Sequence, residues 1–300
     1  SPIQNITSLT TLYLNNTDVD DFSLLQSMTS LRELQLASNN FTDLSAVANL
    51  IFLERLDLSN NKLTDIEALA NLTNLTSLSL YRNDLINIVP LSPLVNLTEL
   101  DVSYNHINDI SVLSNLLALT RLSIGGNSVT DLSILATMTQ LEQLNIDGLN
   151  QSDINLVINL VNLQELSFVS NLITDLSPLT NLSSMNSLSV AGEFVSDFSI
   201  ISSLTLLEFL TIDNLPNNNL SFLANFTSLQ SISIWSAPNL NDLSELNALN
   251  SLQSIYINNS LISDLSTLST LTNLTELGIS SAQLVDISAI TNLTNLVWVN

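Results

Sequence analysis

Cysteine is absent from this sequence of 300 residues, and histidine occurs once, at His106. Without cysteine there are no disulfide staples and no thiolate metal sites, and the redox compartment stays undetermined. A single histidine argues against most metal and acid–base chemistry, because imidazole is the usual ligand and proton carrier near neutral pH. The sequence therefore predicts a protein without a metal ion or another cofactor.

Basic residues are also scarce. Five lysines and arginines stand against 28 aspartates and glutamates, which gives a formal net charge of −23. The last base is Arg121, and the chain beyond it contains 15 acids and no lysine or arginine. This imbalance excludes a nucleic-acid binder that works through basic patches, and it excludes a polybasic membrane-surface segment.

A 22-residue unit recurs along the whole chain, and such a fixed period identifies an array rather than separate globular domains. The unit reads LxxLxLxxNxL followed by TDLSxLxxLTN, and its spacing changes once, by one residue, around Pro238 and Asn239. We predict a single array over residues 1–300 with about 13 complete turns. The first leucine position of the unit is occupied by Leu9, Leu31, Leu53, Leu75, Leu97, Leu119, Leu141, Leu163, Met185, Leu207, Leu229, Leu252, Leu274 and Leu296.

Both ends of the chain fall inside a unit. Ser1–Ile6 reads like the second half of a unit, and the chain stops at Leu296–Asn300, where the next strand would begin. Solenoid ends expose apolar core unless a capping unit covers them, so we expect a fragment of a longer protein. Since no signal peptide and no run of 18 apolar residues occurs, we expect any secretion signal or anchor outside this stretch and no membrane insertion within it.

The segment LxxLxL predicts a short strand in every turn. Alternation places Leu34 and Leu36 on one face and the residue between them on the other. Strands that are one circuit apart can pair only in parallel, so they stack into a sheet at about 4.8 Å per turn. The remaining leucines of the unit are expected to fill the interior behind this sheet.

An asparagine follows the second strand leucine by three residues in six turns. Its amide both donates and accepts hydrogen bonds, so it can satisfy backbone groups where the chain turns inward. We predict a structural ladder of Asn39, Asn61, Asn83, Asn105, Asn127 and Asn171. The same slot is filled elsewhere by Thr17, Leu149, Glu193, Leu215, Ala237, Ser260 and Ala282, so we expect the second half to be less regular.

A second polar column is more persistent. It consists of Asp21, Asp43, Asp65, Asp109, Asp131, Asp153, Asp175, Asp197, Asp242, Asp264 and Asp286, with Asn87 and Asn219 as substitutes. An aspartate followed by serine two residues later accepts backbone N–H bonds and starts a turn or a short helical segment. The alternative is a column of Ca²⁺ sites, since hard cations prefer clustered carboxylates. We favour turn initiation, because capping requires only the one aspartate per turn that is present.

The combined pattern TDLSPLTNLxxLxxLxLxxNxI, seen in Thr174–Asn181 and Thr64–Asn83, resembles the leucine-rich repeats of bacterial internalins and related surface proteins. The resemblance covers essentially the whole chain. It implies an α/β solenoid, a right-handed superhelix with a parallel β-sheet on the concave face and short turns or 3-10 segments on the convex face. It also implies that the concave sheet face binds another protein, usually outside the cell.

Catalytic signatures are missing. No GxSxG, GxxxxGK or HExxH motif occurs, and the many serines and aspartates are accounted for by the repeat. His106 has Asp101 and Asp109 nearby in sequence, but its slot holds different residue types in other turns, as an exposed loop position would. We therefore predict that the protein is not an enzyme.

The informative positions are those that point out of the strands, because the fold leaves them free. Tyrosine, tryptophan and arginine are the residue types enriched at binding hot spots. We predict partner-binding residues at Tyr81, Arg82, Tyr104, Arg121, Arg55, Phe209, Trp235 and Tyr256. Four of the five glycines lie between the two aromatic groups, at Gly125, Gly126, Gly148 and Gly192. They predict either a shallow depression or an easier turn where the asparagine ladder falters.

Together these observations predict a non-catalytic protein-recognition module. Its partner is expected to be a protein, a receptor or surface component, bound through the concave face in adhesion or receptor binding. The expected location is extracellular or at a cell surface. The alternative is a structural spacer or assembly unit in a larger surface or filamentous protein, with no specific concave ligand.

Overall fold

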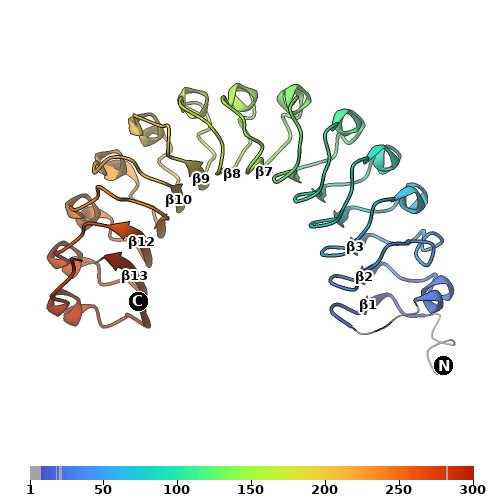
Figure 1. The fold of residues 1–300 in the computed structure, drawn as a ribbon, viewed down its shortest axis with the longest axis horizontal. Helices are drawn as coiled ribbons and strands as arrows, with labels where there is room; N and C mark the ends of the chain where they lie inside the picture. Colours follow the sequence, from blue (N-terminus) through green and yellow to red (C-terminus); the bar gives the residue numbers. More distant parts are fainter. Residues whose placement is uncertain (1–7, 18, 20–21, 282) are drawn as a thin grey trace. The chain divides into compact units, whose positions relative to one another are not determined.

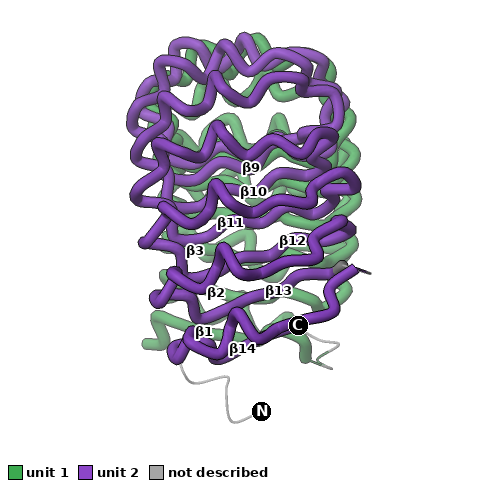
Figure 2. The backbone as a smooth tube through the Cα atoms, turned by 90° about the vertical axis from the view of Figure 1, so that its left-hand side faces the viewer, with its two compact units in different colours: residues 1–149 green, residues 150–300 purple. Residues whose placement is uncertain are grey.

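The computed structural model describes residues 8–17, 19, 22–281 and 283–300. The predicted half-unit Ser1–Ile6, Asp21 and Ala282 lie outside the described residues. The chain forms two compact units, unit 1 over residues 1–149 and unit 2 over residues 150–300 (Figure 2). Within each unit the strands line the inner face of the stacked turns, and the 3-10 coils lie on the outer face (Figure 1). The prediction of one array concerns how the two units continue into each other, and it stays a prediction.

The described part of unit 1 contains seven parallel strands, which pair in sequence order. The strands are β1 (Thr11–Tyr13), β2 (Glu33–Gln35), β3 (Arg55–Asp57), β4 (Ser77–Ser79), β5 (Glu99–Asp101), β6 (Arg121–Ser123) and β7 (Gln143–Asn145). The 3-10 helices are η2 (Ser23–Ser27), η3 (Glu67–Asn71), η4 (Val89–Leu91), η5 (Ser111–Asn115) and η6 (Ser133–Thr137).

Unit 2 contains seven parallel strands in its described residues, again in sequence order. The strands are β8 (Glu165–Phe168), β9 (Ser187–Ala191), β10 (Phe209–Asp213), β11 (Ser231–Ile234), β12 (Ser254–Ser260), β13 (Glu276–Ser281) and β14 (Trp298–Val299). The 3-10 helices are η7 (Asn155–Val157), η8 (Ser177–Leu179), η9 (Ser199–Ser203), η10 (Ser221–Asn225), η11 (Ser244–Ala248), η12 (Ser266–Thr270) and η13 (Ser288–Asn292). No α-helix occurs among the described residues of either unit.

The pairing register follows the repeat period. Leu34 in β2 lies opposite Leu56 in β3, and both side chains are buried. The residues on either side of each central leucine face outward, as strand alternation requires. The predicted leucine-rich-repeat solenoid with a parallel sheet is therefore confirmed. One strand more than the 13 expected complete turns is present, because Trp298–Val299 pairs with β13 although its turn is unfinished.

The aspartate column initiates the 3-10 segments. Asp175 accepts hydrogen bonds from the Ser177 hydroxyl at 2.7 Å and from the Ser177 N–H at 2.8 Å. The bond from the Ser177 hydroxyl, followed by the bond from the N–H, holds the pKa of the Asp175 carboxyl below its usual value. Asn219 accepts the same backbone bond from Ser221 at 2.8 Å, so the turn does not require a charge. Within the described ranges, no three histidine, cysteine, aspartate or glutamate side chains come together as a possible metal site.

The two units end their strands differently. In unit 1 every strand has three residues, whereas strands in unit 2 extend to seven. Leu215 and Ala237 occupy the ladder slot in unit 2, and both are buried. There the backbone continues to pair, since the Leu215 N–H donates to the Ser236 carbonyl at 2.7 Å. Longer strands thus replace the asparagine ladder, and the irregularity expected for this half is limited in the described strands to a register shift between Ile257 and Ser260.

Candidate binding surface

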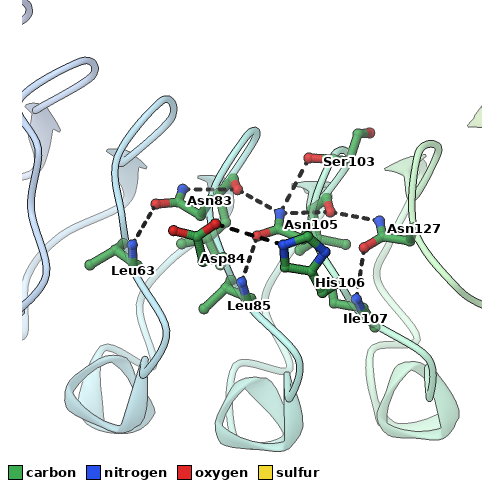
Figure 3. A network of polar contacts seen from close by, with 11 residues as sticks. Leu63, Asn83, Asp84, Leu85, Ser103, Asn105, His106, Ile107 and Asn127 are labelled. Carbon is green, nitrogen blue, oxygen red and sulfur yellow. Dashed lines mark hydrogen bonds and ion pairs between the residues drawn. The ribbon is translucent and has the colours of Figure 1, made fainter.

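Five of the six predicted ladder asparagines lie at the strand exits of unit 1, and Asn171 lies in unit 2. Figure 3 shows three of those in unit 1, Asn83, Asn105 and Asn127. The Asn105 Oδ1 atom accepts a hydrogen bond from the Leu85 N–H at 3.0 Å. Its Nδ2 atom donates to the carbonyls of Leu80 and Val102, both at 3.0 Å. The Asn105 side chain is buried. One amide therefore links its own turn to the preceding turn.

The other ladder positions make the same type of bond, in which Oδ1 accepts an N–H from the preceding turn. These bonds, between 2.8 and 3.0 Å, join Asn39 to Thr17, Asn61 to Phe41, Asn83 to Leu63, Asn127 to Ile107 and Asn171 to Gln151. Ser260 is too short to reproduce this arrangement. Its buried hydroxyl has no hydrogen-bond partner among the described residues.

The residue immediately before the ladder slot has a positive φ in most turns, and we call these positions the left-handed column. Small or amide residues occupy most of the column, namely Asn16, Ser38, Asn60, Gly126, Gly148, Ser170, Asn214 and Asn259. Arg82 and Tyr104 adopt the same backbone, with φ of 53° and 55°. This conformation costs residues other than glycine and asparagine about 1–2 kcal/mol. Two large, exposed side chains therefore stand where the backbone favours small ones.

Arg82 and Tyr104 meet Tyr81 in a cluster that we call the tyrosine–arginine cluster. The two tyrosine rings are 5.4 Å apart between centroids and inclined at 76°. The Arg82 guanidinium carbon lies 5.2 Å from the Tyr81 ring centroid and 5.4 Å from that of Tyr104. Both distances are within the roughly 6 Å range of cation–π attraction. Arg82 forms no ion pair with any described residue, so its charge remains available.

Gly126 makes room for this cluster from the next turn. A Cβ atom at Gly126 would lie 2.9 Å from Cδ1 of Tyr104, which is closer than such atoms approach. Gly126 also has a φ of +64°, so it serves the turn as well as the close contact. The predicted depression across the glycines stays a prediction, since Gly192 belongs to unit 2.

Arg55 and Arg121 lie at the other end of the strands. Both are exposed at the start of a strand, where Arg55 neighbours Glu33 and Arg121 neighbours Glu99 in the sheet register. Neither forms an ion pair with a described residue. The structure thus brings together three of the five residues predicted for unit 1 and leaves the two strand-start arginines separate from them.

Two carboxylates in the strands of unit 1, Asp101 and Glu33, accept hydrogen bonds. Burial raises the pKa of the Asp101 carboxyl, although the Ser103 N–H donates to it at 2.9 Å and opposes the shift. Tyr13 donates its hydroxyl to Glu33 at 2.9 Å, which raises the pKa of the Tyr13 hydroxyl. The strands of unit 1 therefore combine a few exposed cations with half-buried acids.

His106 lies on the surface beside Asp84. Its Nε2 atom lies 3.7 Å from Oδ1 of Asp84, and both side chains are exposed (Figure 3). Such an exposed pair contributes little to stability, at about 0–1 kcal/mol. Its place on the surface agrees with the exposed loop position predicted from the repeat.

In unit 2, Trp235 and Tyr256 flank a hollow of about 240 Å³. Its lining, which we call the aromatic hollow, consists of Ser233, Ile234, Trp235, Tyr256 and Asn258. The Trp235 side chain is 62% exposed. Ser233 in β11 pairs with Tyr256 in β12. The rings of Trp235 and Tyr256 therefore belong to neighbouring turns. Phe209 is also exposed but lies at the start of β10, outside the lining.

Three residues outside the predicted site hold Tyr256 in place. Its hydroxyl donates to Oε2 of Glu276 in a short hydrogen bond, which raises the pKa of the Tyr256 hydroxyl. The Trp298 ring lies 5.6 Å from the Tyr256 ring at 48°. A Cβ atom at Gly278 would lie 2.9 Å from Cδ1 of Tyr256, so only glycine fits below the rings. The repeat period indicates that these residues are neighbours in the sheet, because Gly278 follows Tyr256 by one turn and Trp298 follows Glu276 by one turn.

Comparison with known proteins gives a consistent family. The family described as leucine rich repeats (2 copies) matches residues 7–49, 51–94 and 95–133. The structure of an internalin (inlF) from Listeria monocytogenes is 30% identical, with a TM-score of 0.79 over 99% of this chain and 88% of its own. Internalin C2 from the same species is 36% identical, with a TM-score of 0.58 over 62% of this chain and 81% of its own.

A leucine-rich-repeat protein of Leptospira interrogans shares the fold alone, at 21% identity and a TM-score of 0.69 over 99% of this chain and 79% of its own. No curated protein matches the chain. Among the described residues, no helix has the length and hydrophobicity required to cross a membrane.

Proposed function

Because this chain belongs to the internalin-like leucine-rich-repeat proteins, we propose that it recognises another protein through the exposed inner faces of its strands. Leucine-rich-repeat folds are typical of protein-binding modules and are generally non-catalytic. We place one anchor of this recognition at the tyrosine–arginine cluster of unit 1.

The observation that carries the proposal is the occupancy of the left-handed column. Arg82 and Tyr104 are exposed there at a backbone cost that glycine or asparagine would avoid. Strained backbone at an exposed position points to a functional demand on the side chain. Packing does not provide this demand, since the Tyr104 side chain remains 50% exposed.

The cluster has the chemistry of a binding hot spot. Tyr81 and Tyr104 offer flat, rigid surfaces with few rotatable bonds, and the Arg82 guanidinium beside both rings can bind a partner carboxylate with two parallel hydrogen bonds. The ring contacts hold the guanidinium in place, which reduces the entropy lost on binding. A partner that presents an acidic side chain beside an apolar surface fits this anchor.

We also propose that the protein acts outside the cell or at a cell surface, in adhesion or receptor binding, on the strength of its internalin-like family. The net charge of −23 supports a protein partner over nucleic acid, because phosphate binding draws on lysine and arginine. A structural spacer without a specific ligand is the competing function, and the experiment below separates the two.

The test is partner capture with matched variants of the whole chain. Immobilised wild type, Tyr81→Ala/Tyr104→Ala and the outer-face variant Glu67→Ala are exposed to surface extracts, and bound proteins are identified by mass spectrometry. A partner of the cluster binds wild type and Glu67→Ala, and its affinity for the double variant falls by at least about 2 kcal/mol, or roughly 30-fold.

Thermal unfolding provides the control. The double variant is expected to unfold within about 2 °C of wild type, because both rings are surface residues whose loss leaves the core intact. If every captured protein binds the double variant as tightly as wild type, the cluster is not the anchor. If no protein binds in a saturable manner, the spacer function is favoured.

A further inference from the structure

The aromatic hollow of unit 2 differs in charge from the cluster of unit 1. Unit 2 contains 12 aspartates and glutamates and no lysine, arginine or histidine. The field at its strand face therefore comes from carboxylates without internal cations to compensate them. A cation that arrives here meets no competing positive side chain from the same unit.

Two carboxylates lie beside the hollow on opposite sides. Asp213 ends β10, next to Trp235, whose N–H donates to the Ile212 carbonyl at 3.0 Å. Glu276 lies on β13, where it accepts the Tyr256 hydroxyl. Both rings of the hollow are thus flanked by negative charge, which strengthens their attraction for a cation.

The size of the hollow selects the occupant. Pockets for small-molecule ligands usually enclose about 300–1,000 Å³, whereas this hollow encloses about 240 Å³. It suits a single side chain better than a cofactor or metabolite. Trp235 provides an exposed apolar wall for a hydrocarbon stem, and Asn258 adds an amide at the rim.

The hollow is also rigid on the side of Tyr256. The ring is fixed by Gly278 below it, by Trp298 beside it and by the hydroxyl bond to Glu276. A ring that is already held in place loses little entropy on binding, so the entropy cost does not offset the weak cation–π attraction. This support has no role in the unit core, because Tyr256 and Trp298 are not buried.

We propose that the aromatic hollow receives a lysine or arginine side chain of the protein partner. The cation lies against the faces of Trp235 and Tyr256, while Asp213 and Glu276 balance its charge. The inference rests on the proposed function, since it names the chemistry that a protein partner presents to unit 2. It complements the tyrosine–arginine cluster, which takes the opposite charge.

The test uses a synthetic probe and the two tryptophans of the chain, Trp235 and Trp298, as reporters. An acetylated and amidated nonapeptide of alternating lysine and serine is titrated into the ¹⁵N-labelled whole protein, and the indole N–H resonances are followed by NMR. Trp298→Phe assigns the signals. We expect a saturable shift of the Trp235 indole with the lysine peptide, and none with a peptide in which norleucine replaces lysine.

Matched variants separate the hollow from general charge attraction. Tyr256→Ala, followed through the Trp235 indole, and Trp235→Ala, followed through peptide fluorescence anisotropy, are each expected to weaken the lysine peptide about 3- to 30-fold. Phe194→Ala removes an exposed aromatic elsewhere in unit 2 and is expected to leave binding unchanged.

Three results overturn the proposal. They are equal binding of the lysine peptide to wild type and both hollow variants, equal binding of the norleucine peptide, and no binding of either peptide. None of them affects the proposed function, which is tested at Tyr81 and Tyr104 in unit 1. Conversely, lysine-peptide binding at the hollow would stand even if the tyrosine–arginine cluster proved dispensable.

Discussion

Replacement of Asn105 by alanine removes a complete amide from the interior of unit 1. The Leu85 N–H loses its acceptor, and the carbonyls of Leu80 and Val102 lose one donor each. These three backbone groups differ in the hydrogen bonds that they keep after the substitution. Leu80 still accepts from Asn83 at 3.0 Å, and Val102 still accepts from Asn127 at 2.9 Å.

The magnitude follows from this difference. Only the Leu85 N–H is left buried and unpaired, and an unsatisfied buried donor costs about 1–3 kcal/mol. Counting each lost bond of Asn105 separately would overestimate the loss, because the carbonyls keep partners. We therefore expect Asn105→Ala to lower the free energy of unfolding by about 1–3 kcal/mol.

Ser260→Ala is the matched control in the same slot. The Ser260 hydroxyl is buried and has no partner within the described ranges, so its removal leaves no additional group unpaired. We expect a change in the free energy of unfolding within about 0.5 kcal/mol of zero.

Urea unfolding followed by circular dichroism measures both variants, and amide hydrogen exchange reports the Leu85 N–H directly. Asn105→Ala is expected to speed exchange at Leu85 more than at residues two turns away, since arrays open locally. Equal stability of the two variants, or unchanged protection of Leu85, would refute the argument that the amide carries this cost.

Two further predictions concern the aspartate column and Gly278. The pKa values of Asp175 and Asp264 are lowered in the folded state, so their bonds stabilise the fold above the unfolded pKa of about 3.9 and lose this effect as the pH falls through the lower folded values. Urea midpoints at pH 7 and pH 2 are expected to show that Asp175→Asn/Asp264→Asn destabilises relative to Glu193→Gln/Glu245→Gln at pH 7 and less so at pH 2; a difference as large at pH 2 as at pH 7 would contradict this. Gly278→Ala is expected to displace the stacked rings above it and change the near-ultraviolet circular dichroism, and an unchanged spectrum would show that the close contact is relieved elsewhere.

The repeat period was enough to predict strands, register and ladder positions. A spacing of 22 residues places Leu34 opposite Leu56 whatever the surrounding side chains, because a fixed circuit allows one parallel pairing. The same reasoning found the outward positions, including Tyr81 and Trp235. These features depend on backbone geometry, which the hydrophobic pattern determines.

Contacts between side chains are harder to predict from the sequence. The contact of Arg82 with two tyrosine rings depends on rotamers and on a left-handed backbone that the residue types disfavour. The sequence predicts Arg121 as a partner-binding residue like Tyr81, Arg82 and Tyr104, but Arg121 lies at the start of its strand and the other three lie beyond the strand ends. Loss of the ladder asparagine predicts a less regular second half, whereas Leu215 allows the backbone to continue pairing with the next turn.

The left-handed column makes this fold easy to retarget. Its residues follow the buried strand leucines and precede the ladder slot, so an exchange there leaves the interior untouched. Most of the described turns offer one such position, and a new side chain there costs at most about 1–2 kcal/mol in backbone energy. Arg82 and Tyr104 occupy two such positions in adjacent turns. Substitutions at these positions can therefore change the recognition surface one turn at a time, while the core leucines stay the same.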